Sequence, residues 1–409
     1  MTSNAISQSV DFLPQRRLTI AILEEACAGG SGRHVADLAS HLAAAGHHVH
    51  LLYSSTHLDD RFRDGLKDLQ ALGGWSTALP LQHNVHPSDV GSILEVRAYL
   101  LKHGPFDIFH CHSTKAGFLG RLAAMGLGIP IIYTPHAFLS MSPVSGRISF
   151  LGAHFVERIL SNASDIIICV SEEEMNHARA LGIPRAKIRM IPNGISLRDA
   201  QEAKALRSIV RRELNLAGTD VCIGAVGRLV EQKAFHVLID AFALAIPQLA
   251  QNVKLVIVGD GPLLSGLQRL ATRRSVQGRV MFQGRLPGLR TMSAFDLFAM
   301  SSCSEGHPYT LIEALALGLP IVTTAIGGAQ SSVLPGVNGF VSPIGDAKSM
   351  AGNLVTVAQS PALRGQMASA SLRIANQFTL ETMLRRITQV YEEQVKTTGY
   401  AAQAASAGR

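Results

Sequence analysis

The sequence predicts an α/β protein built from two doubly wound, Rossmann-like parallel-sheet domains that face a shared cleft. Its 409 residues exceed the size at which one hydrophobic core keeps growing, so two domains are expected. Short apolar runs alternate with amphipathic stretches from residue 17 to about 375, which is typical of parallel sheets covered by helices on both faces. The pattern starts afresh near residue 221, and this restart indicates two similar sheets.

The predicted strands are short apolar runs bounded by polar or turn-forming residues. In the first half they span 17–23, 48–53, 106–112, 129–135, 165–171 and 188–192. In the second half they span 221–227, 254–259, 280–284, 296–301 and 320–325.

We place the domain boundary just after Asn193 and Gly194, where a turn pair follows a predicted strand. The expected parts are a flexible tail (1–15), the first domain (16–195), the second domain (196–378), a helix that crosses back to the first domain (379–396) and a second flexible tail (397–409). Open parallel sheets bind ligands at the carboxyl ends of their strands, so the site should lie in the cleft between the domains.

The composition narrows the class of protein. Hydrophobic residues make up 47% and charged residues 16%, which excludes a disordered chain. No apolar run approaches the roughly 18 residues that cross a bilayer, and the N-terminus lacks a secretion signal, so we expect a cytoplasmic protein. The cysteines lack metal-ligand or disulfide spacing and are interpreted as reduced core thiols: Cys27, Cys111, Cys169, Cys222 and Cys303.

The formal net charge of +7 lies entirely in residues 196–409, because residues 1–195 hold equal numbers of acidic and basic side chains. A basic half favours an anionic ligand. Nucleic acid is not expected as a partner, because only 5% of residues are aromatic and no nucleic-acid-binding signature occurs.

The strongest motif is SSCSEGHPYTLIEALALGLP, from Ser301 to Pro320, directly after a predicted strand. A glycine at 306 and a proline at 308 predict a tight loop and a helix that begins near Tyr309, whose free amide groups attract phosphate. Glu305 stays in the loop, while Glu313 lies roughly 6 Å deeper at about 1.5 Å rise per residue. Glu305 and Glu313 project from the same short segment, whereas the paired carboxylates of glycosidases flank one bond from opposite sides. We expect them to bind hydroxyls at two places on one elongated ligand; alternatively they are an ordinary loop residue and a solvated helix residue.

A second motif, AVGRLVEQKAFHVLIDAF, follows the first predicted strand of the second domain. Its cations Arg228 and Lys233 lie near a helix start, where they can neutralise a departing diphosphate without magnesium. The chain has no Asp-x-Asp pair, so we expect neither a metal nor another cofactor. The alternative is two surface cations that flank a loop.

Together these residues resemble the GT-B retaining glycosyltransferases of family four. The likeness rests on Gly227-Arg228 to Lys233, on the Glu305 to Glu313 spacing and on Ile191-Pro192-Asn193-Gly194. It extends over about residues 17–395 and includes the segments 29–34 (GGSGRH), 106–122 and 133–136 (YTPH). The phrases HSTKAG and YTPHAF are most similar to enzymes that build bacterial exopolysaccharide or lipopolysaccharide repeat units.

The resemblance implies roles for individual residues. Arg228 and Lys233 would contact the donor diphosphate, Glu313 the ribose, and Glu305 the transferred sugar. Supporting contacts would come from Gly306, His307 and Pro308, and the base would lie near Gly284, Arg285 and Leu286. From the first domain, His136 would approach the reacting carbon, and a loop would approach the phosphate or acceptor: Gly29, Gly30, Ser31 and Gly32.

The resemblance also implies the reaction. A hexose would pass from a nucleotide diphosphate sugar, expected to be a UDP-sugar, to a glycan or polyprenyl-diphosphate-linked acceptor in cell-surface polysaccharide biosynthesis. Front-face attack, with the leaving phosphate as base, would retain the anomeric configuration without a protein nucleophile. Two positions depart from the family pattern: Ala234 replaces a usual glycine, which makes a left-handed backbone less comfortable, and His307-Pro308 replaces an aromatic and glycine pair.

Several alternatives remain open. A related GT-B epimerase or phosphorylase, or a non-catalytic nucleotide-sugar-binding protein, would share the same motifs. His110 and His112 lie on one side of a strand and could form half of a metal site, but we favour core or cleft-lining histidines. Gly29, Gly30 and Gly32 do not give the Gly-x-Gly-x-x-Gly spacing of an NAD enzyme.

The stretch 144–160 predicts an amphipathic helix. Its apolar stripe, accompanied by Arg147 and Arg158, consists of Ile148, Leu151, Phe155 and Ile159. We expect this stripe to pack into its own domain. The alternative is peripheral contact with the inner face of the cell membrane.

Overall fold

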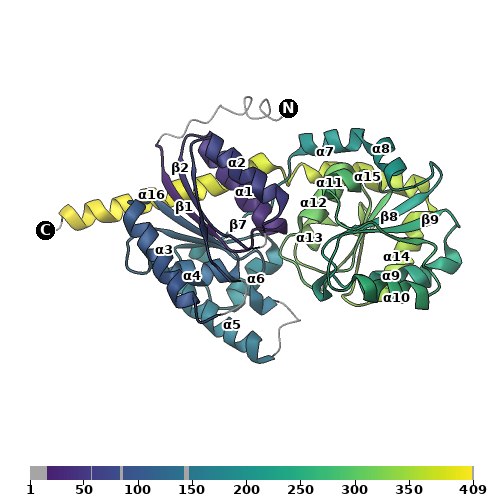
Figure 1. Ribbon diagram of the computed structural model, residues 1–409, viewed down its shortest axis with the longest axis horizontal. Coiled ribbons are helices and arrows are strands. Elements are labelled where there is room, and N and C mark those ends of the chain that lie inside the picture. The colour runs from purple at the N-terminus through teal and green to yellow at the C-terminus, as the bar shows by residue number, and fades with distance from the viewer. Residues whose placement is uncertain (1–15, 57, 83–85, 142–146, 408–409) are drawn as a thin grey trace.

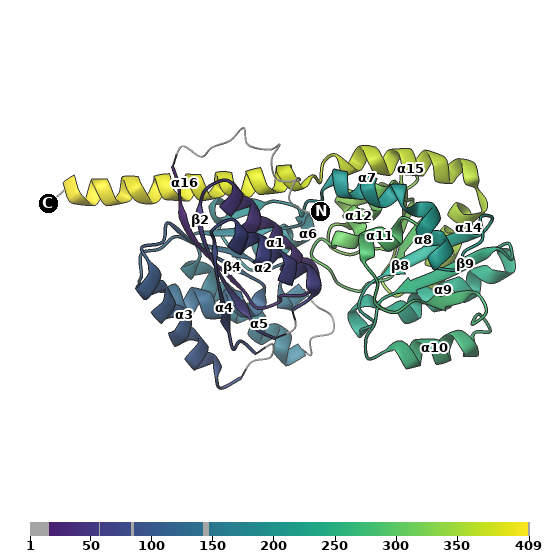
Figure 2. The ribbon, with the colours of Figure 1, turned by 45° about the horizontal axis from the view of Figure 1, so that its top comes forward.

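The computed structural model describes residues 16–407 except 57, 83–85 and 142–146. It contains two α/β units side by side, and the C-terminal helix α16 runs back along the first unit (Figures 1 and 2). Both sheets are parallel, which confirms the predicted fold class of two doubly wound domains.

The first sheet has the strand order β3-β2-β1-β4-β5-β6-β7. Its strands are β1 (Thr19–Glu24), β2 (His48–Ser54), β3 (Trp75–Leu79), β4 (Ile108–His112), β5 (Ile131–Thr134), β6 (Ile166–Cys169) and β7 (Ile188–Met190). Its helices are α1 (Gly29–Ala44), α2 (Asp60–Ala71), α3 (Asp89–His103), α4 (Thr114–Ala124), α5 (Arg147–Leu160) and α6 (Glu172–Ala180). Strand β1 pairs with both β2 and β4, so the strand order reverses between β1 and β4.

The second sheet has the order β10-β9-β8-β11-β12-β13, which reverses between β8 and β11. Its strands are β8 (Val221–Val226), β9 (Val253–Val258), β10 (Val280–Phe282), β11 (Leu297–Met300), β12 (Ile321–Thr324) and β13 (Gly339–Ser342). Its helices are α7 (Leu197–Ala205), α8 (Arg207–Glu213), α9 (Phe235–Ala245), α10 (Leu264–Arg273), α11 (Gly288–Met292), α12 (Tyr309–Leu317), α13 (Ala329–Ser332), α14 (Ala347–Gln359) and α15 (Pro361–Ala375).

Two strands, β3 and β13, were not predicted. Both lie at the edge of their sheet. An edge strand is only partly covered, so β3 (WSTAL) and β13 (GFVS) need no continuous apolar run and mix polar or glycine residues with apolar ones. The strands that were predicted are all the inner strands of both sheets and the other two edge strands, β7 and β10.

The two connections between the domains touch each other. The Ile195 N–H donates to the Phe378 carbonyl, and the Leu380 N–H donates to the Ile195 carbonyl, each at 2.9 Å. A Cβ at Gly194 would lie 2.5 Å from the Thr379 carbonyl oxygen, so this crossing requires glycine. The chain thus enters and leaves the second domain at one point.

Helix α16 (Leu380–Ala407) then returns to the first domain. Its buried side chains join the core beneath β1 and α1: Met383, Leu384, Ile387, Val390 and Tyr391. The helix continues to Ala407, so the expected tail from residue 397 is wrong for 397–407, where an alanine-rich sequence continues the helix. The expected tail at 1–15 and the last two residues lie outside the described residues.

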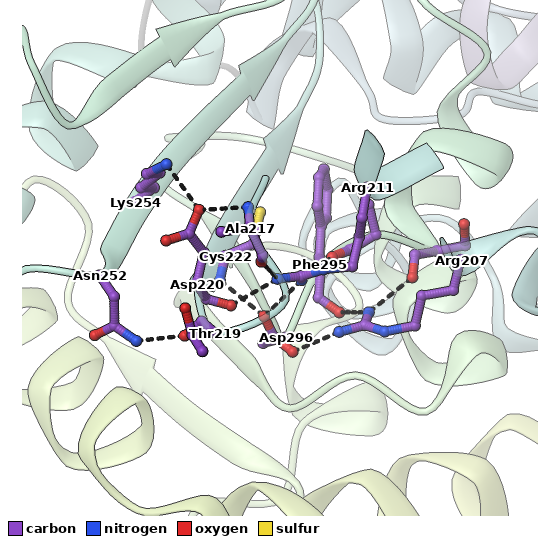
Figure 3. Close-up of polar contacts among 12 residues, drawn as sticks. Arg207, Arg211, Ala217, Thr219, Asp220, Cys222, Asn252, Lys254, Phe295 and Asp296 are labelled. Carbon is purple, nitrogen blue, oxygen red and sulfur yellow. Dashed lines mark hydrogen bonds and ion pairs between the residues drawn. The ribbon is translucent and has the colours of Figure 1, made fainter. Parts of the chain in front are cut away.

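A polar cluster ties α8 to the second sheet (Figure 3). The Asp296 carboxylate accepts hydrogen bonds from Arg207 at 2.6 Å, from Arg211 at 3.1 Å and from the Cys222 N–H at 2.8 Å. Asp220 pairs with Lys254 at 2.7 Å. Apart from the two arginines of α8, these residues precede or begin β8, β9 and β11, at the edge opposite to the ligand-binding carboxyl ends of the strands, so we assign the cluster a structural role.

Candidate active site

The candidate donor site lies where the strand order of the second sheet reverses. The loop after β8 carries Arg228 and Lys233, and the loop after β11 carries Glu305. Two neighbouring strands whose connections leave in opposite directions open a crevice at their carboxyl ends. The two predicted motifs therefore meet at one crevice.

These two loops are tied together by hydrogen bonds. Lys233 Nζ lies 2.5 Å from Glu305 Oε1. Gln232 Nε2 donates to the Ser304 carbonyl at 2.7 Å, and the Cys303 N–H donates to the Gln232 carbonyl at 2.9 Å. Lys233 and Glu305 are thus held side by side, which links the cation expected at the diphosphate to the carboxylate expected at the sugar.

Arg228 lies in the same loop and is exposed. Its guanidinium has no hydrogen-bond or ion-pair partner among residues 16–407 as far as the structure describes them. An uncommitted arginine beside the crevice can receive an oxyanion.

Helix α12 begins at Tyr309 after Pro308, as predicted. Its first amide groups have no carbonyl partner within the helix and carry the positive end of the helix dipole. A Cβ at Gly306 would lie 3.0 Å from the carbonyl carbon and oxygen of His136. A larger residue would push these two backbones apart by a few tenths of an ångström, so glycine suits the close approach of the donor loop to the first domain.

Glu313 is buried in α12, on the side where the chain leaves β10. An ideal Cβ at Gly288 would lie 3.9 Å from Glu313 Oε2, so the segment after Leu286 passes directly beside this carboxylate. Gly284 adopts a φ of +66°, and its carbonyl accepts the Gly259 N–H at 2.7 Å. The expected base-binding segment, including the exposed Arg285, therefore lies along the same sheet edge as Glu313.

The glycine-rich segment of the first domain forms the first turn of α1, so the expectation of a loop is wrong. Gly29 and Gly30 are exposed, and Ser31 donates to Glu24 at 2.5 Å. A Cβ at Gly32 would lie 2.6 Å from the backbone carbon of Cys27, so close packing explains this glycine. The Gly29 N–H donates to Asp59 at 2.8 Å, and the expected approach of this segment to the phosphate or acceptor stays a prediction.

Four histidine rings pack against one another in the first domain: His34, His110, His112 and His136. Burial lowers the pKa of His34 to about 4 and the pKa of the other three well below the usual value. His110 contacts Tyr391 at 2.6 Å and Thr134 at 2.8 Å, which confirms a core position. All four are therefore neutral near pH 7 and can donate or accept hydrogen bonds.

Three of these histidines could hold a metal ion. One ring nitrogen each of His34, His112 and His136 lies within 4.8 Å of the others, and His112 Nδ1 is 3.2 Å from His136 Nε2. Two nitrogens bound to one zinc at about 2.0 to 2.1 Å are about 3.3 Å apart. The 3.2 Å distance between the His112 and His136 nitrogens therefore fits two ligands of one zinc ion. It fits an N–H···N hydrogen bond equally well. The absence of a metal stays a prediction.

The backbone that presents His136 is strained. His136 and Ala137 have φ angles of +57° and +103°. The Glu174 carboxylate accepts the Ala137 N–H at 2.7 Å and the Val170 N–H at 2.6 Å, and burial raises its pKa to about 7. Glu174 was not among the residues predicted from the sequence, although Ser171-x-x-Glu174 is a helix-start signal that could have revealed it.

The domains contact each other directly across the cleft. Arg33 Nη1 lies 2.5 Å from Glu313 Oε1, and Glu173 accepts the Gly328 N–H at 3.0 Å. The Asn193 amide donates to the His307 carbonyl at 2.7 Å. The His307 ring contacts the Asn193 N–H and Ser332, and the donor contact expected from the segment after Gly306 stays a prediction.

The predicted helix over 144–160 is α5, but its stripe does not pack into its own domain where the structure describes it. Phe155 is 65% exposed and Ile159 is 51% exposed. The side chains of Ile148 and Leu151 lie outside the described residues. The expectation of burial is therefore wrong for the C-terminal half of the stripe.

Two doubly wound parallel-sheet domains, with a C-terminal helix that crosses back to the first, form the architecture of GT-B glycosyltransferases. Sequence comparison agrees. Residues 28–199 match the family described as "Glycosyltransferase Family 4", and residues 207–373 match "Glycosyl transferases group 1". The chain belongs to glycosyltransferase family 4.

Curated relatives share this class. One is the UDP-Gal:alpha-D-GlcNAc-diphosphoundecaprenol alpha-1,3-galactosyltransferase of Escherichia coli, 28% identical over 72% of this chain and 78% of that protein. Another is the lipopolysaccharide core biosynthesis glycosyltransferase LpsE of Rhizobium meliloti, 30% identical over 58% of this chain and 67% of that protein.

Among solved structures, Anabaena HepE in complex with UDP is similar with a TM-score of 0.75, 23% identity and coverage of 92% of this chain and 100% of that one. This likeness supports the fold. In the part of the chain that the structure describes, no helix is both long and apolar enough to span a bilayer.

Proposed function

We propose that this glycosyltransferase moves a hexose from a UDP-sugar to a polyprenyl-diphosphate-linked or glycan acceptor, with retention and without a metal. One observation carries the proposal: Arg228, Lys233, Glu305 and the start of α12 follow the two neighbouring strands at which the strand order reverses, and the His136 backbone approaches Gly306 from the first domain. The donor would lie along this crevice, from a base near Gly284–Leu286 to a sugar near Glu305.

The proposed leaving group is a nucleoside diphosphate held by positive groups. The exposed Arg228 can approach one phosphate, and Lys233 can bridge between a phosphate oxygen and Glu305. The α12 amide groups add partial positive charge. Fixed cations and dipoles stabilise the charge that develops as the bond to phosphate breaks, a task that magnesium performs in many other transferases.

Retention is proposed to follow from attack on the face that the diphosphate leaves. The acceptor hydroxyl oxygen would bond to the anomeric carbon, the bond from that carbon to the phosphate oxygen would break, and the hydroxyl proton would pass to the departing phosphate. Glu305 is paired with Lys233, which favours sugar binding by this carboxylate over nucleophilic attack. The neutral His136 would hold a sugar or acceptor hydroxyl without adding charge.

The proposed donor and acceptor rest partly on relatives. The Escherichia coli relative is named for transfer from UDP-Gal to a diphosphoundecaprenol-linked sugar, and HepE was solved with UDP. A lipid-linked acceptor requires the enzyme to work at the inner face of the cell membrane, which we propose as its location.

The surface that would face the membrane is the layer formed by α3 and α5, which flank α4 (Figure 1). Its exposed apolar side chains are Val90, Leu94 and Leu101 on α3 and Phe155, Val156 and Ile159 on α5. Val90, Leu94 and Leu101 lie within about 40° of one another around α3, at about 100° per residue, so they form one stripe. An apolar stripe with basic neighbours such as Arg158 suits an anionic bilayer surface.

Vesicle binding tests this surface. We expect the doubly substituted Phe155→Ser, Ile159→Ser protein to sediment less with phosphatidylglycerol-containing vesicles than the unsubstituted protein. Leu244→Ser is the matched control, because Leu244 is 54% exposed in the second domain. Equal sedimentation of all three proteins would reject membrane contact through α5.

The transfer reaction is tested by mass spectrometry with UDP-, GDP- and ADP-sugars and lipid-diphosphate acceptors, with and without EDTA. We expect a UDP-sugar to be used, EDTA to have no effect, and NMR of the product to show the donor's anomeric configuration. Tight UDP binding without transfer or donor hydrolysis would instead identify a non-catalytic nucleotide-sugar-binding protein.

A further inference from the structure

A buried ion pair joins the two domains at the carboxylate expected to bind ribose. Arg33 Nη1 of α1 lies 2.5 Å from Glu313 Oε1 of α12, and the two side chains are only 8% and 7% exposed. Residues this far apart in the sequence meet because the first turns of α1 and α12 face each other across the cleft.

The contact between these helices is close and specific. The Arg33 guanidinium carbon lies 4.5 Å from the centre of the Tyr309 ring, and a Cβ at Gly30 would lie 3.3 Å from Tyr309 Cδ2. On its other side Arg33 Nε lies 3.7 Å from Asp37, which pairs with Arg61. The arginine is therefore fixed by an aromatic face and a second carboxylate.

Stability alone is a poor explanation for this pair. Taking two charges out of water costs several kcal/mol per ion in general, so a buried ion pair is weak evidence for stabilisation. Two buried polar atoms at this contact, Arg33 Nε and the Tyr309 hydroxyl, also lack a hydrogen-bond partner within the described residues. Buried polar atoms of this kind call for a functional explanation.

The positions of the two Glu313 carboxylate oxygens supply a functional explanation. Arg33 contacts Oε1, while Oε2 faces Gly288, beside the segment where we propose that the base lies. A planar guanidinium fixes the orientation of a carboxylate better than an ammonium group does. Holding one oxygen therefore aims the other at the nucleoside.

We propose that Arg33 is a positioning residue that orients Glu313 toward the ribose hydroxyls of the donor, so that nucleotide recognition is complete only when both domains are together. This inference rests on the proposed function, in which Glu313 binds ribose. It assigns the first domain a part in donor recognition, through α1 and not through a direct contact with the nucleotide.

The opposite reading is a latch, in which Arg33 competes with the nucleotide for Glu313. The two readings predict opposite effects of Arg33 on the affinity for the nucleotide. A positioning residue strengthens binding of a nucleotide that carries ribose hydroxyls, whereas a competing residue weakens it.

Calorimetric dissociation constants of the full-length protein for UDP and for 2′,3′-dideoxy-UDP separate these readings. We expect Arg33→Met to weaken UDP binding about tenfold and dideoxy-UDP binding less than about twofold, since the analogue lacks the hydroxyls that Glu313 would hold. Arg33→Lys keeps the charge without the planar fork and should give an intermediate loss for UDP alone. Arg63→Met is the control, because Arg63 is an exposed arginine of α2 that pairs with Asp60, and it should bind both nucleotides like the unsubstituted protein.

Glu313→Gln completes the cycle. It should weaken UDP binding, and adding Arg33→Met to it should change the constant no further, because the arginine would act only through the carboxylate. Tighter or unchanged UDP binding in Arg33→Met, or an equal loss for both nucleotides, would overturn the inference. If Glu313→Gln leaves UDP binding unchanged, the proposed role of Glu313 fails as well. If Glu313→Gln weakens UDP binding but the Arg33 variants leave it unchanged, the proposed function stands and the inference about Arg33 is wrong.

Discussion

Replacing Ala234 by glycine should relieve backbone strain at the start of α9. Ala234 has φ +45° and ψ +40°, the left-handed region, directly after Lys233. A residue with a Cβ pays roughly 1 to 2 kcal/mol for this conformation. Glycine pays nothing there, but the substitution also removes a buried methyl group and makes the unfolded chain more flexible.

A matched control isolates the strain. Ala241 lies in the middle of α9 and is buried like Ala234, so Ala241→Gly loses a similar methyl group and adds similar unfolded-state freedom. Ala241 is in a regular helix, where no strain is relieved. The free energy of unfolding should therefore be about 1 to 2 kcal/mol higher for Ala234→Gly than for Ala241→Gly.

Urea denaturation followed by circular dichroism measures this difference. The unfolding midpoints give the two free energies if the slopes agree. Equal destabilisation by the two substitutions would refute the claim that the backbone at Ala234 is strained.

Three further predictions concern the buried Glu174, the Asp296 cluster and metal binding by the histidines. Because folding raises the pKa of Glu174 from 4.5 to about 7, the wild-type protein becomes less stable as the pH rises between these values. The free energy of unfolding of Glu174→Gln, relative to wild type, should therefore increase by on the order of 2 kcal/mol between pH 5 and pH 8. Urea melts at several pH values measure this difference, and a difference that does not change with pH would contradict the prediction. Asp296→Ala should lower the free energy of unfolding by about 3 kcal/mol without changing the donor KM, because it removes the carboxylate that accepts hydrogen bonds from two arginines and from the Cys222 N–H; an altered KM would argue against a structural role. Metal analysis of the purified protein should find no stoichiometric zinc, whereas one bound zinc that is lost in His112→Ala would assign the cluster of His34, His112 and His136 to a metal.

The sequence predicts most of the fold because parallel strands buried on both faces are mostly apolar. Strands β6 (IIIC) and β11 (LFAM) illustrate this, since every residue in them is buried and apolar. The edge strands β3 and β13 were not predicted, for two different reasons. Partial cover permits Ser76 in β3, whereas β13 begins with a buried glycine because a Cβ at Gly339 would lie 1.9 Å from the Ile321 carbonyl oxygen.

The candidate site is predicted only where the chemistry is local. The start of α12 at Tyr309 follows from the proline and glycine that precede it. The pairing of Arg33 with Glu313 and the capture of the His307 ring by Asn193 depend on how the two domains meet. No pattern in a single sequence encodes the distance between two domains, so these contacts required the structure.

The exposure of α5 shows a related limit. An apolar stripe at helical spacing is the same in sequence whether it packs into a core or faces a membrane. Phe155 could be placed on the surface only from the coordinates.

The catalytic efficiency of Arg228→Ala with the preferred donor and acceptor tests the central claim most directly. If this arginine stabilises the departing diphosphate, kcat/KM should fall by about 10² to 10³, as for the loss of one preorganised charge-stabilising group. Lys348→Ala, which removes an exposed cation far along the chain in α14, should leave it unchanged. An Arg228→Ala enzyme as efficient as Lys348→Ala would contradict the proposal that the cations of the second domain drive departure of the nucleotide.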